Sequence, residues 1–297
     1  MDETDTETDS LTGCRYHPTF LSSTESLRSR ASSLNYEFES GNQTCKSTKK
    51  VSKATFSIRR SSPPRQADYY WGQHYADVMR AEPMPPFLLD VRSDIMKLLN
   101  VPDFSPITVE PPAISYGKVG DSVPSLNSCI VNLYNGDDSV VTPHHDGQAG
   151  STPGAQKAVV AGTSIYSLTA CDEGAERKIQ LYAPQPGSTK PGKVVYEKEL
   201  ANGSLFELPA AANGAYKHGI PKAPKGVVGA RYAFIFRTVV EVEMSVLEER
   251  KREGDRKLAE KAGKRGGEGE SGGGKRPRKG KKRGPTSLRQ DKQMNVD

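Results

Sequence analysis

The chain has 297 residues, of which 34% are hydrophobic and 26% are charged, and its net charge is +6. This composition predicts one folded domain with long polar ends, because a core that drew on the whole chain would need more apolar residues. No apolar run approaches the ~20 residues of a membrane span, and the first residues are acidic where a secretory leader is basic. Four cysteines stand far apart without any Cys-x-x-Cys spacing, which argues against a zinc module or a disulfide framework. We therefore expect a soluble intracellular protein, monomeric and with reduced thiols.

Residues 1–62 open with alternating acidic residues and threonines and hold few large apolar side chains. A segment of that composition buries too little surface to offset its ordering entropy, so we predict that it is disordered. The basic residues between Lys46 and Arg60, Lys53 among them, suit contact with a phosphate backbone, and the alternative is a solvated linker. We place the folded domain at 63–240.

The aromatic cluster Tyr69-Tyr70-Trp71 contains the only tryptophan of the chain. Its rings could stack on an unpaired base, and equally it could be an edge strand that packs on the core. The segment from Phe87 to Leu99 has the apolar spacing of an amphipathic helix, which we expect to lie against a sheet. Residues 100–124 are rich in proline and glycine and predict a loop with one short strand.

Short apolar stretches separated by turns make up most of the remaining domain. Residues 127–134 alternate as a strand does and end at an Asn-Gly turn. Further strands are predicted at 159–170, 178–182, 194–196, 204–208 and 231–240. Many short strands at close spacing indicate a sandwich or a barrel.

The sequence His144-His145-Asp146 follows the Asn-Gly turn. In an extended segment residues i and i+2 share a face, so His144 and Asp146 can bind one ion while His145 points away. The only later histidine is His218. Two histidines and one carboxylate, with positions left open, form the facial triad of non-haem Fe(II) oxygenases. The alternative is a loop with a solvated aspartate.

Arg231 and Arg237 stand at the two ends of an apolar strand, and no acidic residue lies between them. Their even spacing puts both side chains on one face of the strand. A half-buried guanidinium needs an anion, and its planar fork suits a carboxylate. The sequence therefore predicts a carboxylate partner near these two residues.

The charged region 241–297 follows the last predicted strand. Residues 250–297 hold 17 Lys and Arg against 7 Asp and Glu, or +10, which exceeds the net charge of the whole chain. Residues 241–262 are rich in helix formers, and basic runs at 275–279 and 281–283 lie in a glycine-rich stretch. We predict a charged helix and a basic disordered tail. Such a tail is typical of a nuclear-localisation signal read by import machinery or of a nucleic-acid tether, and the alternative is a solubilising tail.

Together these residues resemble the AlkB family of Fe(II)- and 2-oxoglutarate-dependent dioxygenases. The family pattern of Asn-x-Tyr, a turn, His-x-Asp, a distal His before a Pro and Arg-x5-Arg is matched in order and spacing, and the resemblance covers about 64–239. It implies a mainly β fold with flanking helices, a double-stranded β-helix (jelly roll), between disordered N- and C-terminal tails. It further implies that Fe(II) is held by His144, Asp146 and His218, and that 2-oxoglutarate is held by Asn132, Tyr134, Arg231 and Arg237, one of the two arginines pairing with its distal carboxylate.

The resemblance also implies a reaction with O2 that decarboxylates 2-oxoglutarate to succinate and hydroxylates a substrate C–H bond. On an N-methylated base the product would fall apart to formaldehyde and the free base. Methylated nucleic acid is the implied partner, and single-stranded RNA is favoured because a base in a duplex must first be flipped out. The candidate substrate residues are Tyr69, Tyr70 and Trp71, and the expected location is the nucleus, with the cytoplasm as the alternative.

Two other functions stay open at this point. One is a protein hydroxylase or demethylase with the same chemistry, and the other is a non-catalytic nucleic-acid-binding jelly-roll module. Gly147-Gln148 stands where repair members of the family often have acidic residues, and Ala233 and Ile235 stand where the family often has polar ones. The sequence therefore does not select the methylated base.

Overall fold

The computed structural model describes residues 6–38, 52–58, 69–71, 77–79, 81–111, 117–136, 139–147, 159–188, 190–226 and 229–240, with single positions at 252, 256 and 259. At 37–38, 69–71 and 77–79 only the backbone is described. The chain divides into two compact units, Met1–Asp255 and Arg256–Asp297, and the elements named below lie in the first. No helix in the described part of the chain is both long and apolar enough to cross a membrane.

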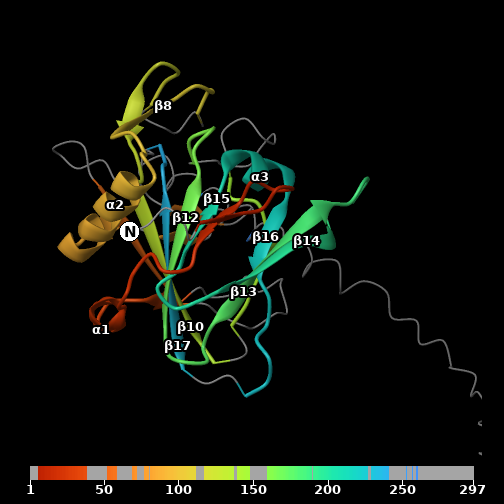
Figure 1. Cartoon of the computed structure of the whole chain (residues 1–297). Helices are drawn as coiled ribbons and strands as arrows, with labels where there is room; N and C mark the ends of the chain where they lie inside the picture. Colours follow the sequence, from red (N-terminus) through yellow and green to blue (C-terminus); the bar gives the residue numbers. More distant parts are fainter. Residues whose placement is uncertain are drawn as a thin grey trace, which may run out of the picture. The chain divides into compact units, whose positions relative to one another are not determined.

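Two sheets form the body of the fold (Figure 1). The larger sheet contains, in sheet order, β1 (Glu7–Thr8), β2 (Arg15–His17), β15 (Leu205–Leu208), β12 (Ile165–Cys171), β17 (Ala230–Arg237), β10 (Ser128–Asn135), β4 (Ser52–Ser57) and β3 (Glu37–Phe38), with β7 (Glu82–Pro83) beside β4. The smaller sheet contains β11 (Val141–His144), β16 (Lys217–Ile220), β13 (Arg177–Pro184) and β14 (Pro191–Leu200). Two separate hairpins pair β5 (Tyr69–Trp71) with β6 (Asp77–Met79), and β8 (Phe104–Pro106) with β9 (Ser122–Pro124).

From β10 onward the chain passes back and forth between the two sheets. β10, β12, β15 and β17 are neighbours in the larger sheet, whereas β11, β13, β14 and β16 form the smaller one. A buried cluster between the sheets joins Tyr134 and Phe206 of the larger sheet to Leu181 and Ile220 of the smaller. This winding of antiparallel strands into two facing sheets is a double-stranded β-helix, so the predicted jelly roll is confirmed.

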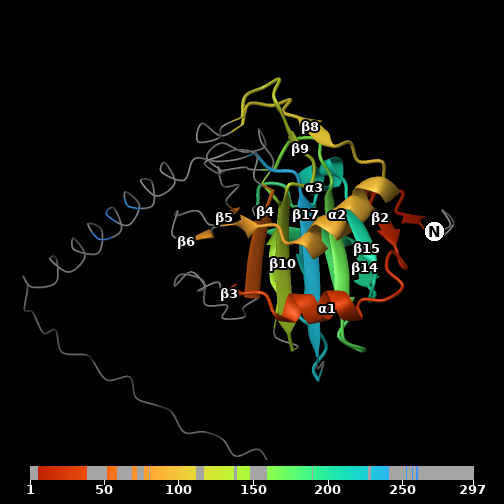
Figure 2. The ribbon, with the colours of Figure 1, turned by 90° about the vertical axis from the view of Figure 1, so that its left-hand side faces the viewer.

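Two helices lie across the outer face of the larger sheet, α1 (Glu25–Ser32) and α2 (Pro86–Leu98) (Figure 2). Proline stands in the first turn of α2, and its buried Leu88 and Ile95 lie on one side of the helix. They share one core cluster with Val131 of β10 and Phe234 of β17. Because side chains alternate along a strand, the neighbours of Val131 and Phe234 face the interior of the jelly roll.

The predicted elements at 87–99 and 127–134 are confirmed as α2 and β10. The strand expected at 159–170 begins only at Ile165, and the one expected at 194–196 runs the full length of β14, ten residues. Residues 100–124 contain two short strands instead of one. The sequence patterns missed β11 and β16, the two strands that carry the histidines, and the short helix α3 (Ala210–Ala215) between β15 and β16.

The prediction that residues 1–62 are disordered is wrong for the described parts of that segment. β2 pairs with β15, and β4 pairs with β10, so both strands belong to the larger sheet. Phe20 and Leu27 are buried in the same core as α2, and the Arg15 guanidinium forms a salt bridge of 2.5 Å with the buried Glu207. Composition misled the prediction because a few apolar residues suffice when distant strands supply their partners. The predicted domain start at residue 63 is therefore too late.

The charged helix expected at 241–262 and the basic tail after it lie outside the described residues, apart from the three single positions. Their role stays a prediction.

If residues 6–38 are part of the core, shortening a buried side chain there will destabilise the whole fold. We expect Phe20→Ala, at 2% exposure, to lower the free energy of unfolding by about 3–5 kcal/mol. The matched control is Leu11→Ala, since Leu11 lies in the same segment at 62% exposure and should change it by less than about 0.5 kcal/mol. Urea unfolding followed by circular dichroism measures both, and equal midpoints for Phe20→Ala and the wild type would contradict this packing.

Candidate metal centre and co-substrate pocket

Three potential metal ligands come together at the edge of the smaller sheet. His144 ends β11 and lies opposite His218 of β16 in the strand register, and Asp146 follows two residues later. The two imidazole rings have centroids 4.5 Å apart, and one ligand atom from each of the three residues lies within 4.8 Å of the others. The predicted grouping of His144, Asp146 and His218 is thus present in the fold.

The close approach of β16 to β11 depends on a residue without a side chain. A Cβ atom at Gly219 would lie 2.7 Å from the carbonyl oxygen of Val141 and 3.1 Å from the nitrogen of Pro143. Both are backbone atoms, so a larger residue would push the strands apart. Gly219 therefore allows its neighbour His218 to meet His144.

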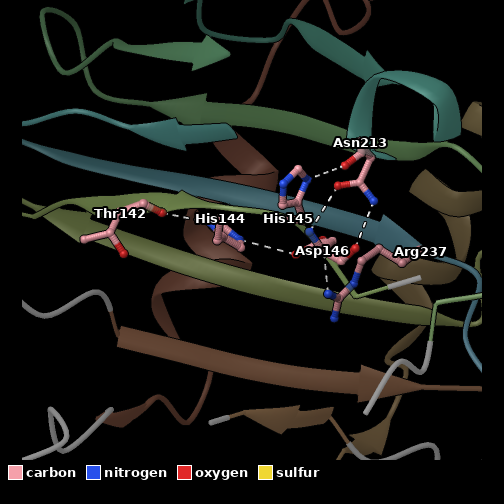
Figure 3. Close-up of polar contacts among 6 residues, drawn as sticks. All are labelled: Thr142, His144, His145, Asp146, Asn213 and Arg237. Carbon is pink, nitrogen blue, oxygen red and sulfur yellow. Dashed lines mark hydrogen bonds and ion pairs between the residues drawn. The ribbon is translucent and has the colours of Figure 1, made fainter. Parts of the chain in front are cut away.

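The hydrogen bond of His144 Nδ1 directs the other ring nitrogen of His144 toward Asp146. Its Nδ1 lies 2.9 Å from the carbonyl oxygen of Thr142, and a carbonyl can only accept, so Nδ1 carries the proton. The Nε2 atom then has a lone pair, which faces Asp146 Oδ1 at 3.3 Å (Figure 3). Two electron-rich atoms at that distance need a cation between them or a proton on the ring, and a histidine oriented by a carbonyl is the usual arrangement in metal sites.

Charge and burial keep Asp146 and His218 in the forms that bind a metal. Burial alone would raise the pKa of the Asp146 carboxyl, but the Arg237 guanidinium at 3.2 Å and the two imidazoles hold that pKa well below its usual range. Burial lowers the pKa of His218 to about 3, and His144 adds to the effect. His218 is therefore neutral, and its buried Nδ1 has no hydrogen-bond partner among the described residues. One carboxylate and two imidazoles suit Fe(II).

His145 points away from the triad, as the alternation predicts. Its Nδ1 lies 2.7 Å from the carbonyl oxygen of Asn213 in α3. The side chain of the same Asn213 contacts the backbone of Asp146 (Figure 3). No sequence pattern pointed to Asn213, because a single Asn in an alanine-rich stretch is an unremarkable capping or turn residue.

The predicted co-substrate residues line one cavity on the inner face of the larger sheet. In the strand register Tyr134 lies opposite Arg231, and Asn132 lies opposite Ala233. All of these residues border the same cavity as the metal triad. The even spacing that the sequence shows thus places Asn132, Tyr134, Arg231 and Arg237 on one side of the sheet, as expected.

The two arginines have different surroundings. Arg237 pairs with Asp146. Arg231 is 1% exposed. Its guanidinium lies over the ring of Tyr134 at 4.9 Å and donates from Nη2 to Thr169 Oγ1 at 3.0 Å. Its Nε and Nη1 have no hydrogen-bond partner among the described residues. A buried guanidinium whose N–H groups lack acceptors is energetically costly unless an anion binds to it. This end of the cavity therefore suits a carboxylate.

Lys53 is a pocket residue that the sequence led us to misplace. We expected it to belong to an exposed basic approach, but it lies in β4 opposite Asn132, is 5% exposed and borders the cavity. The apolar alternation of Ala54, Phe56 and Ile58 was the available signal. Within a lysine-rich stretch it was too short to outweigh composition.

Arg177, which precedes a predicted strand, is buried and supports the turn before the metal ligands. Its Nη2 donates to the carbonyl oxygens of Gly136 at 2.6 Å and Ser139 at 3.3 Å. Arg177 is therefore part of the buried framework of that turn. Tyr69, Tyr70 and Trp71 form strand β5 of a hairpin, but their side chains lie outside what the structure describes, so their contact with a substrate stays a prediction.

A jelly roll with two histidines and one carboxylate at its open edge defines the class of non-haem Fe(II) oxygenases. The family model of the 2OG-Fe(II) oxygenase superfamily matches residues 13–250, which is most of the chain. The chain belongs to this superfamily, and is therefore an Fe(II)- and 2-oxoglutarate-dependent dioxygenase that consumes O2. The match begins far before residue 63, in agreement with the folded N-terminal strands.

Solved structures give more distant similarities. One is "The structure of OsALKBH1", at 13% identity and a TM-score of 0.45, covering 78% of this chain and 99% of the other. Another is an oxidoreductase of the 2OG-Fe(II) oxygenase family from Burkholderia pseudomallei, at 13% identity and a TM-score of 0.41, covering 78% and 89%. No curated protein sequence matches. The family assignment depends on the family model and the metal centre, and not on these remote neighbours.

The geometry predicts that His144 binds the metal and His145 does not. We expect His144→Ala to lose Mn(II) binding, with Mn(II) used in place of the air-sensitive Fe(II). His145→Ala should bind with an affinity close to that of the wild type, because its ring points toward α3. The free Mn(II) signal in electron paramagnetic resonance measures both, and the reverse order of affinities would contradict the assignment.

Proposed function

We propose that this dioxygenase removes methyl groups from N-methylated bases in nucleic acid, with RNA favoured over DNA. The observation that carries the proposal is the co-occurrence, in one cavity, of the His-x-Asp and His triad with the Asn-x-Tyr and Arg-x5-Arg residues that resemble the AlkB family. Motif order alone gave that resemblance. Its support is now spatial, since residues far apart in the chain border the same space.

When Fe(II), 2-oxoglutarate and O2 are bound, they supply an oxidation that forms succinate and CO2 and hydroxylates one methyl C–H bond. The hydroxymethyl group on nitrogen then breaks down to formaldehyde and the free base. The chain's own residues hold and orient these partners. His144, Asp146 and His218 would hold the metal on one side, which leaves the other side to the co-substrate and O2.

Arg237 has the task of keeping Asp146 ionised at the metal. Without the guanidinium at 3.2 Å, burial would favour the neutral acid, which is a poor ligand. Arg231 and Tyr134 lie at the other end of the inner face, where the free donors of Arg231 suit the distal carboxylate of 2-oxoglutarate. Of the two arginines that the sequence offered for this role, Arg231 is thus the better candidate.

The choice of nucleic acid is supported by features around the site. The β5–β6 hairpin carries the aromatic triplet, which could stack on a base that has left its helix. The basic residues of 241–297 suit contact with the phosphate backbone or with the nuclear import machinery. We therefore propose a nuclear location, with the cytoplasm as the alternative. A single strand is favoured because its bases need not be flipped out of a duplex. A protein hydroxylase or demethylase with the same chemistry is the second candidate, because the cavity itself does not select the methylated group.

Replacing each arginine by lysine separates their roles, since lysine keeps the charge and loses the planar fork. Arg231→Lys should weaken apparent 2-oxoglutarate affinity on the order of tenfold to a hundredfold, the equivalent of one charge-assisted contact. Arg237→Lys should weaken Mn(II) binding more than 2-oxoglutarate binding. Titrations of both ligands by calorimetry test this, and unchanged 2-oxoglutarate affinity in Arg231→Lys would refute its role.

The proposed reaction is tested by formaldehyde release from oligonucleotides that each carry one N-methylated base. We expect release from single-stranded RNA above that from matched DNA, and none from the Asp146→Ala variant.

A chain that ends at residue 262 should keep turnover on short oligonucleotides at saturation but bind them more weakly and with a flatter salt dependence. Succinate formation stimulated by methylated peptides and by no oligonucleotide would favour the protein demethylase instead.

A further inference from the structure

Asn213 occupies a buried position next to the metal-binding turn. It lies in the six-residue helix α3, is 1% exposed and precedes His218 by five positions. Its own backbone N–H bonds the carbonyl of Pro209 at 2.9 Å, within the helix. Its side chain is therefore not needed to hold α3 together and is directed at another part of the chain.

That side chain satisfies both backbone polar groups of Asp146. Asn213 Nδ2 donates to the Asp146 carbonyl oxygen at 3.0 Å, and Asn213 Oδ1 accepts from the Asp146 N–H at 3.0 Å. A third bond runs from His145 Nδ1 to the Asn213 carbonyl oxygen at 2.7 Å (Figure 3). The β11–β16 ladder ends at His144, so Asp146 has no strand partner among the described residues. Its buried backbone groups need other hydrogen bonds, and Asn213 supplies both.

We propose that Asn213 is a positioning residue for the metal centre, which fixes the backbone of Asp146 so that its carboxylate faces His144 and His218. The proposal rests on the metal-dependent function proposed above, although not on the identity of the substrate. Asp146 is held from two ends, by Arg237 at the carboxylate and by Asn213 at the main chain. Arg237 contacts only the carboxylate of Asp146, whereas Asn213 contacts its backbone.

The hydrogen bonds from Asn213 to Asp146 also connect the two segments that supply the metal ligands. His144 and Asp146 come from β11 and the turn after it, whereas His218 comes from β16, which follows α3 directly. Asn213 thus links the segment before His218 to the residue that supplies the carboxylate. Removal of such a supporting contact costs about tenfold to a hundredfold in metal affinity in other sites.

Asn127 offers a matched control for this role. It is fully buried, and its side chain makes the same pair of bonds to a backbone, donating to the Val239 carbonyl at 2.9 Å and accepting from the Val239 N–H at 2.8 Å. Neither Asn127 nor Val239 belongs to the metal triad. A variant at Asn127 therefore loses an equivalent structural clamp without touching Asp146.

The experiment measures Mn(II) dissociation constants of the full-length protein by electron paramagnetic resonance, without 2-oxoglutarate or substrate. We expect Asn213→Ala to bind Mn(II) about tenfold to a hundredfold more weakly, and Asn127→Ala to stay within about threefold of the wild type. In the absence of metal, both variants should have a lower Tm than the wild type. Only in Asn213→Ala should the rise in Tm on adding Mn(II) shrink.

If Asn213→Ala does not fold, Asn213→Asp decides the same comparison, because it keeps the acceptor for the Asp146 N–H and loses the donor to the Asp146 carbonyl. Wild-type Mn(II) affinity in a folded Asn213 variant would overturn the proposal and leave the proposed function intact. Equal losses at Asn127 and Asn213 would overturn it as well, since they would show a general loss of stability. A wild-type protein without Mn(II) binding would instead overturn the metal-dependent function and this proposal with it.

Discussion

The ion pair between Asp146 and Arg237 is the constraint on which the site depends. The Asp146 side chain is 10% exposed and that of Arg237 is 3% exposed, so neither charge could lie in this interior alone. Their attraction keeps the carboxylate ionised between two imidazoles, one of them neutral through burial. The three side chains are thereby arranged for a metal ion. The ion adds the positive charge that the facing His144 Nε2 and Asp146 Oδ1 atoms require.

The jelly roll makes this pair possible because it brings β17, the last described strand, beside β10, which precedes the metal-binding turn. β17 runs antiparallel to β10, and residues with even spacing on each face the interior. Arg231 and Arg237 therefore lie at opposite ends of one inner face, with the apolar Ala233 and Ile235 between them. A ligand with a carboxylate at one end and a metal-binding group at the other matches that order of charged, apolar and charged surface.

Site residues could be predicted from the sequence where a local pattern and the chemistry of the side chains agree. The alternation in His144-His145-Asp146 and the even spacing of the two arginines are properties of single strands, so they could be predicted without the fold. What could not be predicted depends on contacts between distant segments. Lys53 joins the cavity only because β4 pairs with β10, and Phe20 is buried only because α1 and α2 cover the same sheet.

Asn213 shows the same limit most clearly, because its role lies entirely in backbone groups of another segment. A sequence shows which side chains can bind a metal, but it does not show which backbone groups a strand leaves unpaired when its ladder ends. Here the ladder stops at His144, two residues before Asp146, which must carry the carboxylate. The fold needs a turn at that point to aim Asp146, and a turn needs hydrogen bonds from outside the sheet. The short helix α3, which directly precedes the strand of His218, can supply them. It thereby connects the turn of Asp146 to the strand of the third ligand.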